Sequence, residues 1–156
     1  LKEADQTRIG YWGFSRGGGL GYRVLAKTNN IRAAVLIGAP SDQLNSPRRA
    51  EFEEHVYPGI LDGYETDADE ALRRISAIFW PEKISPSTES LLIHGANDSR
   101  VQLSNSLKMA DHLARLERPF RLVVPEGGSH TLIEHMPDVR REIDRWFDTK
   151  LKEQSR

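Results

Sequence analysis

The sequence contains no cysteine. This absence excludes a disulfide framework, a thiolate metal site and a cysteine nucleophile. It leaves the compartment open, and we favour a cytoplasmic over a secreted location. Apolar stretches that approach the roughly 20 residues of a membrane-spanning helix are also missing, and the first residues do not resemble a signal peptide. We therefore expect no membrane partner.

An excess of charge of one sign is missing too. The chain has 22 Lys and Arg against 23 Asp and Glu, a formal net charge of −1, and the two signs are interspersed. A nucleic-acid surface needs a basic stripe with interleaved aromatic residues, which this sequence lacks. Apolar residues make up 38% of the chain, enough for a packed core. The composition predicts one ordinary globular domain without a nucleic-acid partner.

Nucleotide-binding motifs are absent, although glycines cluster between Gly13 and Gly21. No G-x-G-x-x-G register fits, because counting from Gly19 and Gly21 places the final glycine on Val24. The sequence also lacks G-x-x-x-x-G-K-[ST]. We therefore expect neither a nucleotide cofactor nor any other cofactor or metal ion.

The most informative stretch present is Gly13-Phe14-Ser15-Arg16-Gly17, which reads G-x-S-x-G. A short apolar run, residues 8–12, precedes it, and a helical stretch, residues 21–27, follows it. Strand, sharp turn and helix are typical of a nucleophile elbow, whose serine is held in a strained backbone conformation. Close neighbours of the serine must be small. We expect a side chain to collide at both Gly13 and Gly17.

Four apolar strands alternate with helices along the chain. The expected strands are residues 7–14, 31–39, 91–94 and 120–124, and the expected helices between and after them are residues 18–28, 102–116 and 137–152. This alternation predicts parallel βα units, and uninterrupted apolar runs such as residues 33–37 are typical of strands covered on both faces. Helical periodicity predicts two buried stripes, one of Leu103, Leu107, Ala110 and Ala114, the other of Val139, Ile143, Trp146, Phe147 and Leu151.

Residues from about 41 to 87 differ in character, being rich in charge and in proline. We expect two helices here, about 47–56 and about 67–79, the second with a buried stripe of Leu72, Ile75, Ile78 and Phe79. The segment reads as a helical insertion over the edge of the sheet and not as a separate domain. Two roles stay open for it, core packing and one wall of a substrate pocket.

A serine nucleophile needs a base, and the base needs an orienting carboxylate. In open α/β sheets such residues lie on loops at the carboxyl ends of strands. Three of the expected loops carry Ser15, Asp98 and His130, in the chain order typical of this class of hydrolase. We predict that Ser15 is the nucleophile, His130 its base and Asp98 the acid that holds the histidine tautomer. The Arg16 backbone N–H is the expected oxyanion donor.

Each predicted partner of Ser15 has rivals. Asp42 follows the second expected strand, where some hydrolases carry the acid, whereas Asp111 and Asp138 lie on expected helices and are less able to reach. The other histidines have simpler expected roles, burial at a strand end for His94, exposure for His112, a surface or cap position for His135, and a place in the charged segment for His55. Only His130 follows a strand in a glycine-rich loop.

Four stretches together resemble the catalytic domain of the prolyl oligopeptidase family, within the α/β-hydrolase fold. They are residues 8–18, 31–35, 92–101 and 126–130. The resemblance implies nucleophile, acid and base at Ser15, Asp98 and His130. It also implies further strands before the elbow, with the second oxyanion donor, and in many members an N-terminal β-propeller. Residues 1–5 read like the end of a helix and a turn, so we expect the C-terminal part of a longer catalytic domain.

Two departures from the family pattern bear on specificity. Arg16 stands where peptidase members commonly have tyrosine, and Thr131-Leu132 stands where Gly-Phe is common. No double-Glu motif for a substrate amino terminus is visible. These departures put dipeptidyl-peptidase specificity in question more than the hydrolase chemistry.

The sequence therefore predicts a partial α/β-hydrolase fold, with about four mostly parallel strands flanked by helices and one helical insertion. The expected reaction is cleavage of a small ester or peptide substrate through an acyl-enzyme. The alternative is a non-catalytic fragment or interaction module. Standing alone, such a fragment would present its first strand as an unpaired edge, which promotes association, for example as a homodimer or with a missing half.

Overall fold

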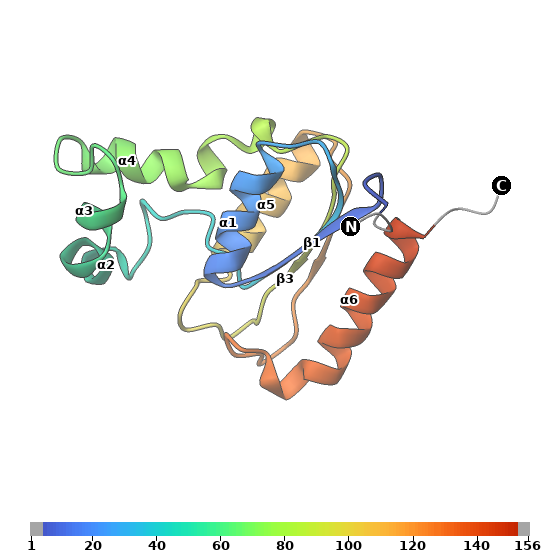
Figure 1. Cartoon of the computed structure of the whole chain (residues 1–156). Helices are drawn as coiled ribbons and strands as arrows, with labels where there is room; N and C mark the ends of the chain where they lie inside the picture. Colours follow the sequence, from blue (N-terminus) through green and yellow to red (C-terminus); the bar gives the residue numbers. More distant parts are fainter. Residues whose placement is uncertain (1–4, 153–156) are drawn as a thin grey trace.

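A four-stranded sheet forms the centre of the computed structural model, which describes residues 5–152 (Figure 1). The strands are β1 (Ile9–Phe14), β2 (Ile31–Ile37), β3 (Glu89–Ile93) and β4 (Phe120–Val123). Their spatial order is β1-β2-β3-β4, and every neighbouring pair is parallel. The expected α/β class is confirmed. The carboxyl ends of all four strands consequently lie along one border of the sheet. The expectation for residues 1–4 lies outside the described residues.

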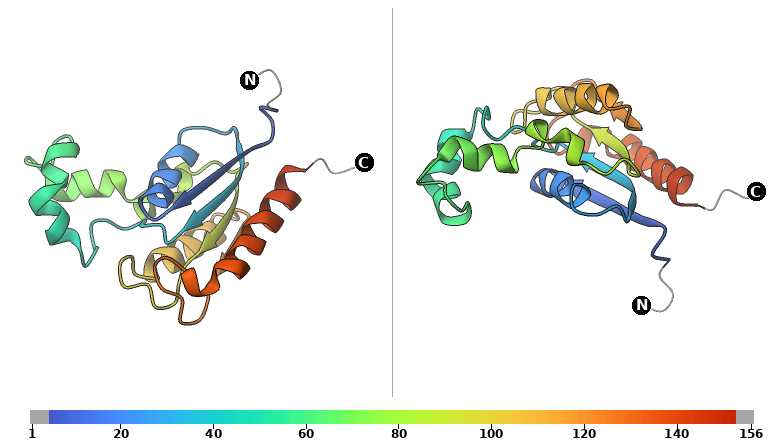
Figure 2. Two further views of the ribbon diagram at one scale, coloured as in Figure 1. Left: turned by 60° about the horizontal axis from the view of Figure 1, so that its bottom comes forward. Right: turned by 90° about the horizontal axis from the view of Figure 1, so that it is seen from above.

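Helices cover both faces of the sheet (Figure 2). Helices α1 (Arg16–Leu25) and α5 (Ser104–Arg115) pack on one face, where Ala34, Leu36 and Leu92 point toward them. Helix α6 (Met136–Leu151) packs on the other face against Val35, Ile37, Leu91 and Ile93. Because alternate residues of a strand face opposite sides, both sides of β2 and β3 must be apolar. This explains the uninterrupted apolar runs in the sequence.

The buried side of α5 differs from the predicted stripe. Ala110 is buried as expected, but Leu107 is 49% exposed and Ala114 is exposed as well. The helix turns Met109 and Leu113 into the core instead, and with them two polar residues, Asn105 and Ser106. Apolar periodicity could not find this face, because two of its buried members are polar.

The predicted insertion contains more and shorter helices than expected. They are α2 (Arg49–His55), α3 (Tyr57–Ile60), α4 (Ala68–Ile75) and the 3₁₀ turns η1 (Ala77–Phe79) and η2 (Pro81–Lys83). The α4 helix begins after Asp67, whose side chain accepts the Glu70 N–H at 2.9 Å, a favourable N-cap. It ends at Ile75, so the second expected helix is broken before Phe79.

The insertion divides into two parts that pack differently. Residues of α2, α3 and α4 form a small cluster of their own around Tyr57, Tyr64 and Leu72, and this part projects beyond the carboxyl ends of the strands (Figure 1). The turns η1 and η2 contribute Ala77 and Trp80 to the core between α1 and α5. The expected stripe of the insertion is therefore split, with Phe79 39% exposed.

Among residues 5–152, every helix is too short or too polar to span a membrane.

Candidate active site

Ser15 sits at the sharp turn between β1 and α1. Its φ of 52° and ψ of −120° lie in a region that non-glycine residues rarely adopt, at a cost of about 1–3 kcal/mol. The Ser15 N–H donates to the Ile37 carbonyl at 2.8 Å, and the Ser15 carbonyl accepts the Gly19 N–H at 3.0 Å. The residue thus ends the sheet ladder and begins the helix, which holds the strained conformation in place, as the G-x-S-x-G context predicted.

The glycines around Ser15 are crowded unequally. A Cβ on Gly13 would lie 2.5 Å from the Gly17 carbonyl oxygen, whereas a Cβ on Gly17 would meet nothing within 4 Å. The expected collision at Gly17 is therefore wrong. It is the Gly17 backbone, held by the Tyr11 hydroxyl at 2.6 Å, that excludes a side chain from Gly13. The second crowded glycine is Gly18, whose Cβ would lie 2.6 Å from that of Ala39.

Two alanine substitutions should separate these positions. Gly13→Ala forces backbone atoms apart and is expected to destabilise the protein by about 1–3 kcal/mol, the usual range for overpacking. Gly17→Ala has free space and replaces a helical glycine, so stability is expected to stay level or to rise by up to about 1 kcal/mol. Denaturant unfolding of both variants in parallel is the measurement. Equal losses in the two variants would contradict the geometry.

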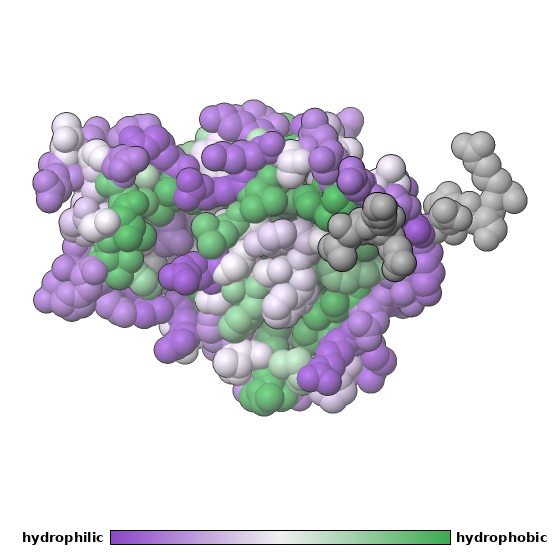
Figure 3. All heavy atoms as spheres, viewed as in Figure 1, coloured by the Kyte–Doolittle hydropathy of each residue, from purple (hydrophilic) through white to green (hydrophobic). Residues whose placement is uncertain are grey.

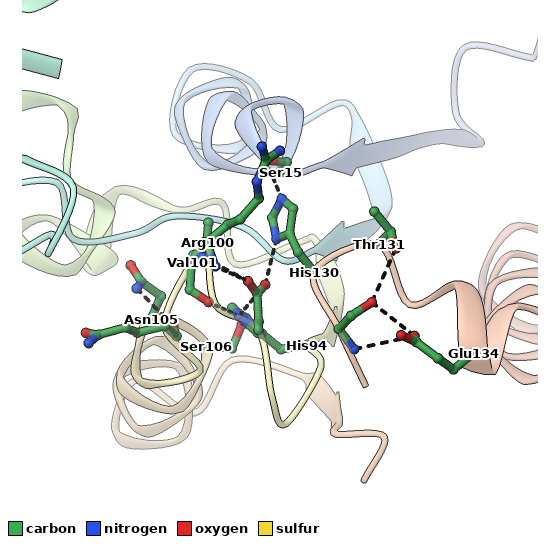
Figure 4. A network of polar contacts seen from close by, with 12 residues as sticks. Ser15, His94, Arg100, Val101, Asn105, Ser106, His130, Thr131 and Glu134 are labelled. Atoms are coloured by element: carbon green, nitrogen blue, oxygen red, sulfur yellow. Dashed lines mark hydrogen bonds and ion pairs between the residues drawn. The ribbon is translucent and has the colours of Figure 1, made fainter. Parts of the chain in front are cut away.

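The structure brings Ser15, His130 and Asp98 together at the carboxyl ends of β1, β4 and β3 (Figure 4). The His130 Nε2 lies 2.9 Å from the Ser15 Oγ, and the His130 Nδ1 lies 2.7 Å from the Asp98 Oδ2. An ionised carboxylate only accepts hydrogen bonds, so the proton belongs on Nδ1 and Nε2 is left to accept the serine hydroxyl. This is the arrangement of a serine, a base and an orienting acid.

Exposure rises along this chain of contacts. The Asp98 side chain is fully buried and that of His130 is 7% exposed, whereas Ser15 is half-buried. The Phe14 ring lies 5.0 Å from the His130 ring, centroid to centroid, and shields the imidazole from one side. The Asp98–His130 contact is thus shielded from solvent, whereas Ser15 lies nearer the surface.

Two glycines let the strand-end loops approach one another. Gly38, at the end of β2, has φ of +52°, and a Cβ there would lie 3.3 Å from the His130 ring and 3.5 Å from the Asp98 Oδ2. A Cβ on Gly95 would lie 2.3 Å from the Gly128 carbonyl oxygen, where the acid loop and the histidine loop cross. The sequence motifs did not predict that Gly38 or Gly95 is needed for this approach. Both glycines lie at or just after the end of a predicted strand, and this position could have indicated that they lie near the site.

The Asp98 carboxylate is held from two sides. Its Oδ1 accepts the backbone N–H groups of Arg100 at 2.8 Å and Val101 at 2.9 Å, which leaves Oδ2 for His130. One carboxylate oxygen thus stabilises the turn, and the other contacts the histidine. The Asp98 N–H also donates to the Gly95 carbonyl at 3.2 Å, so the turn after β3 is as tight as expected.

The histidine loop is tied down by Glu134. The Ser129 hydroxyl donates to the Glu134 Oε2 at 3.0 Å, and the hydrogen bonds from the Glu134 backbone and from Ser129 lower the pKa of this carboxyl below its ordinary value. Leu132 then turns into the α6 side of the core with φ of +54°.

The rival acids have other partners. Asp42 is nearly buried, with Oδ2 3.0 Å from the Lys108 Nζ and Oδ1 accepting the Asn45 N–H at 3.0 Å. Burial raises the pKa of Asp42, but the hydrogen bonds from Lys108 and Asn45 outweigh it, and the pKa falls below its ordinary value. Asp111 and Asp138 pair with arginines of their own helices, Arg115 and Arg141.

The other four histidines do not contact Ser15 in the described part of the chain. His94 is fully buried, as expected, and His55 is exposed within the insertion. His112 is half-buried instead of exposed, because the buried face of α5 is rotated from the expected one. His135 precedes α6, where its Nε2 lies 2.9 Å from the Glu126 carbonyl.

The Arg16 N–H lies at the first residue of α1. A helix N-terminus leaves its first N–H groups without intrahelical acceptors, and no acceptor for the Arg16 N–H occurs among residues 5–152. This N–H, next to the serine, is geometrically suited to receive an oxyanion.

A groove of the described residues lies away from Ser15. It has a volume of about 820 Å³ and is lined by residues of α1 and of the insertion, among them Arg23, Lys27, Ile60, Arg74 and Phe79. Arg23 and Lys27 lie at the carboxyl end of α1, about 15 Å along a ten-residue helix from Ser15. The insertion thus walls a groove, but not one at Ser15. Within residues 5–152 no cluster of three or more His, Asp or Glu could hold a metal ion.

The strand-turn-helix serine on a parallel sheet is the architecture of the α/β hydrolases. The sequence profile of the prolyl oligopeptidase family matches residues 2–154, so the chain belongs to this family. It is similar to venom dipeptidyl peptidase 4 of Vespula vulgaris, 24% identical over 155 residues, which cover 92% of this chain and 18% of the wasp protein.

Solved structures agree with this assignment. Acylaminoacyl peptidase from Pyrococcus horikoshii is 26% identical, with a TM-score of 0.81, over 99% of this chain and 26% of that one. An acylaminoacyl peptidase in complex with Z-Gly-Gly-Phe-chloromethyl ketone matches with a TM-score of 0.82 and 26% identity, again over 99% of this chain and 26% of that one. Porphyromonas gingivalis dipeptidyl peptidase 4, at 20% identity and a TM-score of 0.78, shares the fold over 97% of this chain. The chain thus spans about a quarter of these solved peptidases or less.

Proposed function

We propose that this chain carries the catalytic triad of a serine hydrolase that cleaves a peptide or ester bond. The observation that supports this most is the unbroken series of contacts from the Ser15 Oγ through the His130 ring to the buried Asp98 carboxylate. Two of these contacts join residues 32 and 115 positions apart in sequence. Such contacts need the whole sheet and do not arise from a local turn.

In the proposed reaction His130 Nε2 takes the Ser15 hydroxyl proton while the Oγ attacks the substrate carbonyl carbon. The carbonyl electrons move onto its oxygen, which the Arg16 N–H stabilises. Collapse of this intermediate expels the amine or alcohol, which receives the proton from His130. A water molecule, deprotonated by the same nitrogen, then attacks the acyl-enzyme and releases the acid and the free serine. Asp98 keeps the His130 proton on Nδ1 and stabilises the imidazolium.

Membership of a peptidase family favours a peptide substrate over a simple ester. The related acylaminoacyl peptidase was solved with a peptide chloromethyl ketone, a compound whose peptide portion resembles a substrate. We therefore assign peptides as the preferred class and small esters as the secondary one.

An activity-based fluorophosphonate probe tests the proposal, because it reacts only with a serine whose base is in place. We expect covalent labelling of the intact protein at Ser15, located by mass spectrometry of the digested protein, and loss of labelling after heat denaturation. Absence of label on the native, intact protein would contradict the proposal.

Association through the edge of β1 is a separate proposal about this chain. Among the described residues β1 pairs on one side only, with β2. Trp12 of β1 is 54% exposed and Leu20 of α1 is 48% exposed, and apolar surface appears on this face in Figure 3. An open strand edge with apolar neighbours is a ready surface for pairing with another strand.

We expect the 156-residue chain, expressed alone, to form a dimer through β1. Light scattering of the wild-type chain and of Trp12→Lys measures this, because a charge at an open edge opposes strand pairing. The lysine variant should shift toward monomer, and Ile60→Lys, at an exposed position of the insertion, is the control that should leave the mass unchanged. A monodisperse wild-type monomer would refute edge association.

A further inference from the structure

A second histidine lies against the acid of the proposed triad (Figure 4). His94 follows the last residue of β3 and is fully buried. Its Nε2 is 3.3 Å from the Asp98 Oδ2, the oxygen that also faces His130. The sequence had indicated a buried, satisfied histidine here, but nothing about its neighbours.

The hydrogen bonds of His94 assign its tautomer. Its Nε2 lies 2.8 Å from the Val101 carbonyl oxygen, which can only accept, so the proton belongs on Nε2. Its Nδ1, 2.7 Å from the Ser106 hydroxyl of α5, then accepts from that group. Burial lowers the pKa of His94, and the opposing effects of the Val101 carbonyl and the Asp98 carboxylate do not offset it. The ring is therefore neutral at neutral pH, with its N–H edge beside the carboxylate.

His94 also stabilises the turn after β3 that carries Asp98. The Val101 carbonyl accepts from His94, and the Val101 N–H donates to the Asp98 Oδ1 at 2.9 Å. One residue thus transmits the position of the His94 ring to the carboxylate. The ring itself is anchored to α5 through Ser106. The contacts form a continuous path from α5 through His94 and Val101 to Asp98, and from there to His130.

We infer that His94 is a positioning residue for the proposed triad, which sets the orientation of the Asp98 carboxylate through its Nε2–H and the Val101 carbonyl. This inference rests on the proposed function, since Asp98 is given there the role of orienting His130. His94 does not touch the reacting atoms and acts through Asp98. The two titratable groups that face it are Asp98 and His130.

Two amide substitutions, His94→Gln and His94→Asn, test the roles of the two ring nitrogens separately. A glutamine side chain carries its amide about as far as Nε2 and can still donate to the Val101 carbonyl. An asparagine amide reaches only as far as Nδ1, so His94→Asn keeps a polar contact near Ser106 but loses the donor to Val101. Ser106→Ala is the comparison variant, because it removes the anchoring hydrogen bond but retains the Nε2–H.

Steady-state hydrolysis of a peptide anilide by the intact protein gives the readout. We expect His94→Asn to lower kcat about 10- to 100-fold, the range known for outer hydrogen-bond partners of catalytic groups in metal sites, with KM within about twofold. His94→Gln should recover most of this loss, and Ser106→Ala, which keeps the Nε2–H donor, should lower kcat less than His94→Asn does. A kcat for His94→Asn equal to that of the wild type, or a glutamine variant as impaired as the asparagine variant, would overturn the inference.

A spectroscopic measurement keeps this test separate from the proposed function. The Nδ1–H of His130, hydrogen-bonded to a buried carboxylate, should give the most downfield ring N–H signal in the proton NMR spectrum. We expect His94→Asn to shift or broaden that signal, and Ser106→Ala to change it less. If the signal responds to the two substitutions as expected while the wild-type protein shows neither turnover nor fluorophosphonate label, the proposed function fails and the positioning role of His94 stands. If the wild-type enzyme is active and labelled but the His130 signal is unshifted in His94→Asn, only the positioning role of His94 is refuted.

Discussion

Ser15→Ala is expected to lower kcat by about a millionfold, the loss measured when the nucleophile of another serine hydrolase is removed. The Ser15 Oγ is the atom 2.9 Å from the His130 Nε2, and the described loops place no other hydroxyl within hydrogen-bonding distance of that nitrogen. KM should change little, because binding of the substrate does not use the Oγ–carbon bond. The measurement is single-turnover and steady-state hydrolysis of a peptide anilide by intact protein.

The backbone strain at Ser15 does not depend on the hydroxyl, so the alanine variant should fold as the wild type does. Circular dichroism and the unfolding temperature provide that check. Ser129→Ala is a matched control, since this serine lies next to His130 in sequence but bonds to Glu134. A Ser15→Ala enzyme with more than a thousandth of wild-type turnover would show that another group is the nucleophile.

Asp98→Asn is expected to lower kcat by about 10⁴-fold, as the corresponding change does in a well-studied serine protease. An amide in place of the carboxylate can present an N–H to the His130 Nδ1 and so favours the tautomer whose Nε2 carries the proton. That nitrogen can then no longer accept from Ser15. The side chain keeps its volume, so its fully buried position should still be filled.

Asp42→Asn is the control for the acid, because Asp42 also follows a strand. It is salt-bridged to Lys108, and removing its charge should reduce stability while kcat changes less than about tenfold. Steady-state hydrolysis of the same peptide anilide by Asp98→Asn and Asp42→Asn is the measurement. If Asp42→Asn rather than Asp98→Asn abolished turnover, the acid of the triad would have to be reassigned.

Much of the candidate site could be predicted, because a parallel sheet determines where the residues that follow its strands lie. Once four strands run in one direction, the residues that follow each strand meet at one border. The apolar runs predicted the strands, and the order Ser15, Asp98, His130 then followed from their positions after β1, β3 and β4. The strain at Ser15 was also predictable, because a strand that turns directly into a helix leaves few backbone conformations for the residue between them.

Other features depended on distances that periodicity does not contain. Asp42 and Asp98 both follow strands, so the sequence alone does not distinguish them. Only the fold shows that Asp42 pairs with Lys108, which lies 66 residues further along the chain. The face of α5 was mispredicted because Asn105 and Ser106 are buried by their partners, the Ser41 backbone N–H and the His94 ring. A buried polar side chain is favourable only when paired, and the pairing partner is invisible in a local pattern.

Gly13-Phe14-Ser15-Arg16-Gly17 combines both kinds of information. The sequence alone determined that this stretch is an elbow, that its serine is strained and which loops would face it, because these follow from local geometry and chain order. The tertiary structure alone decided that Gly13 and Gly18 are crowded while Gly17 is not. It alone placed His94 beside Asp98. Both depend on the approach of separate segments, which packing of the whole core sets to within fractions of an ångström.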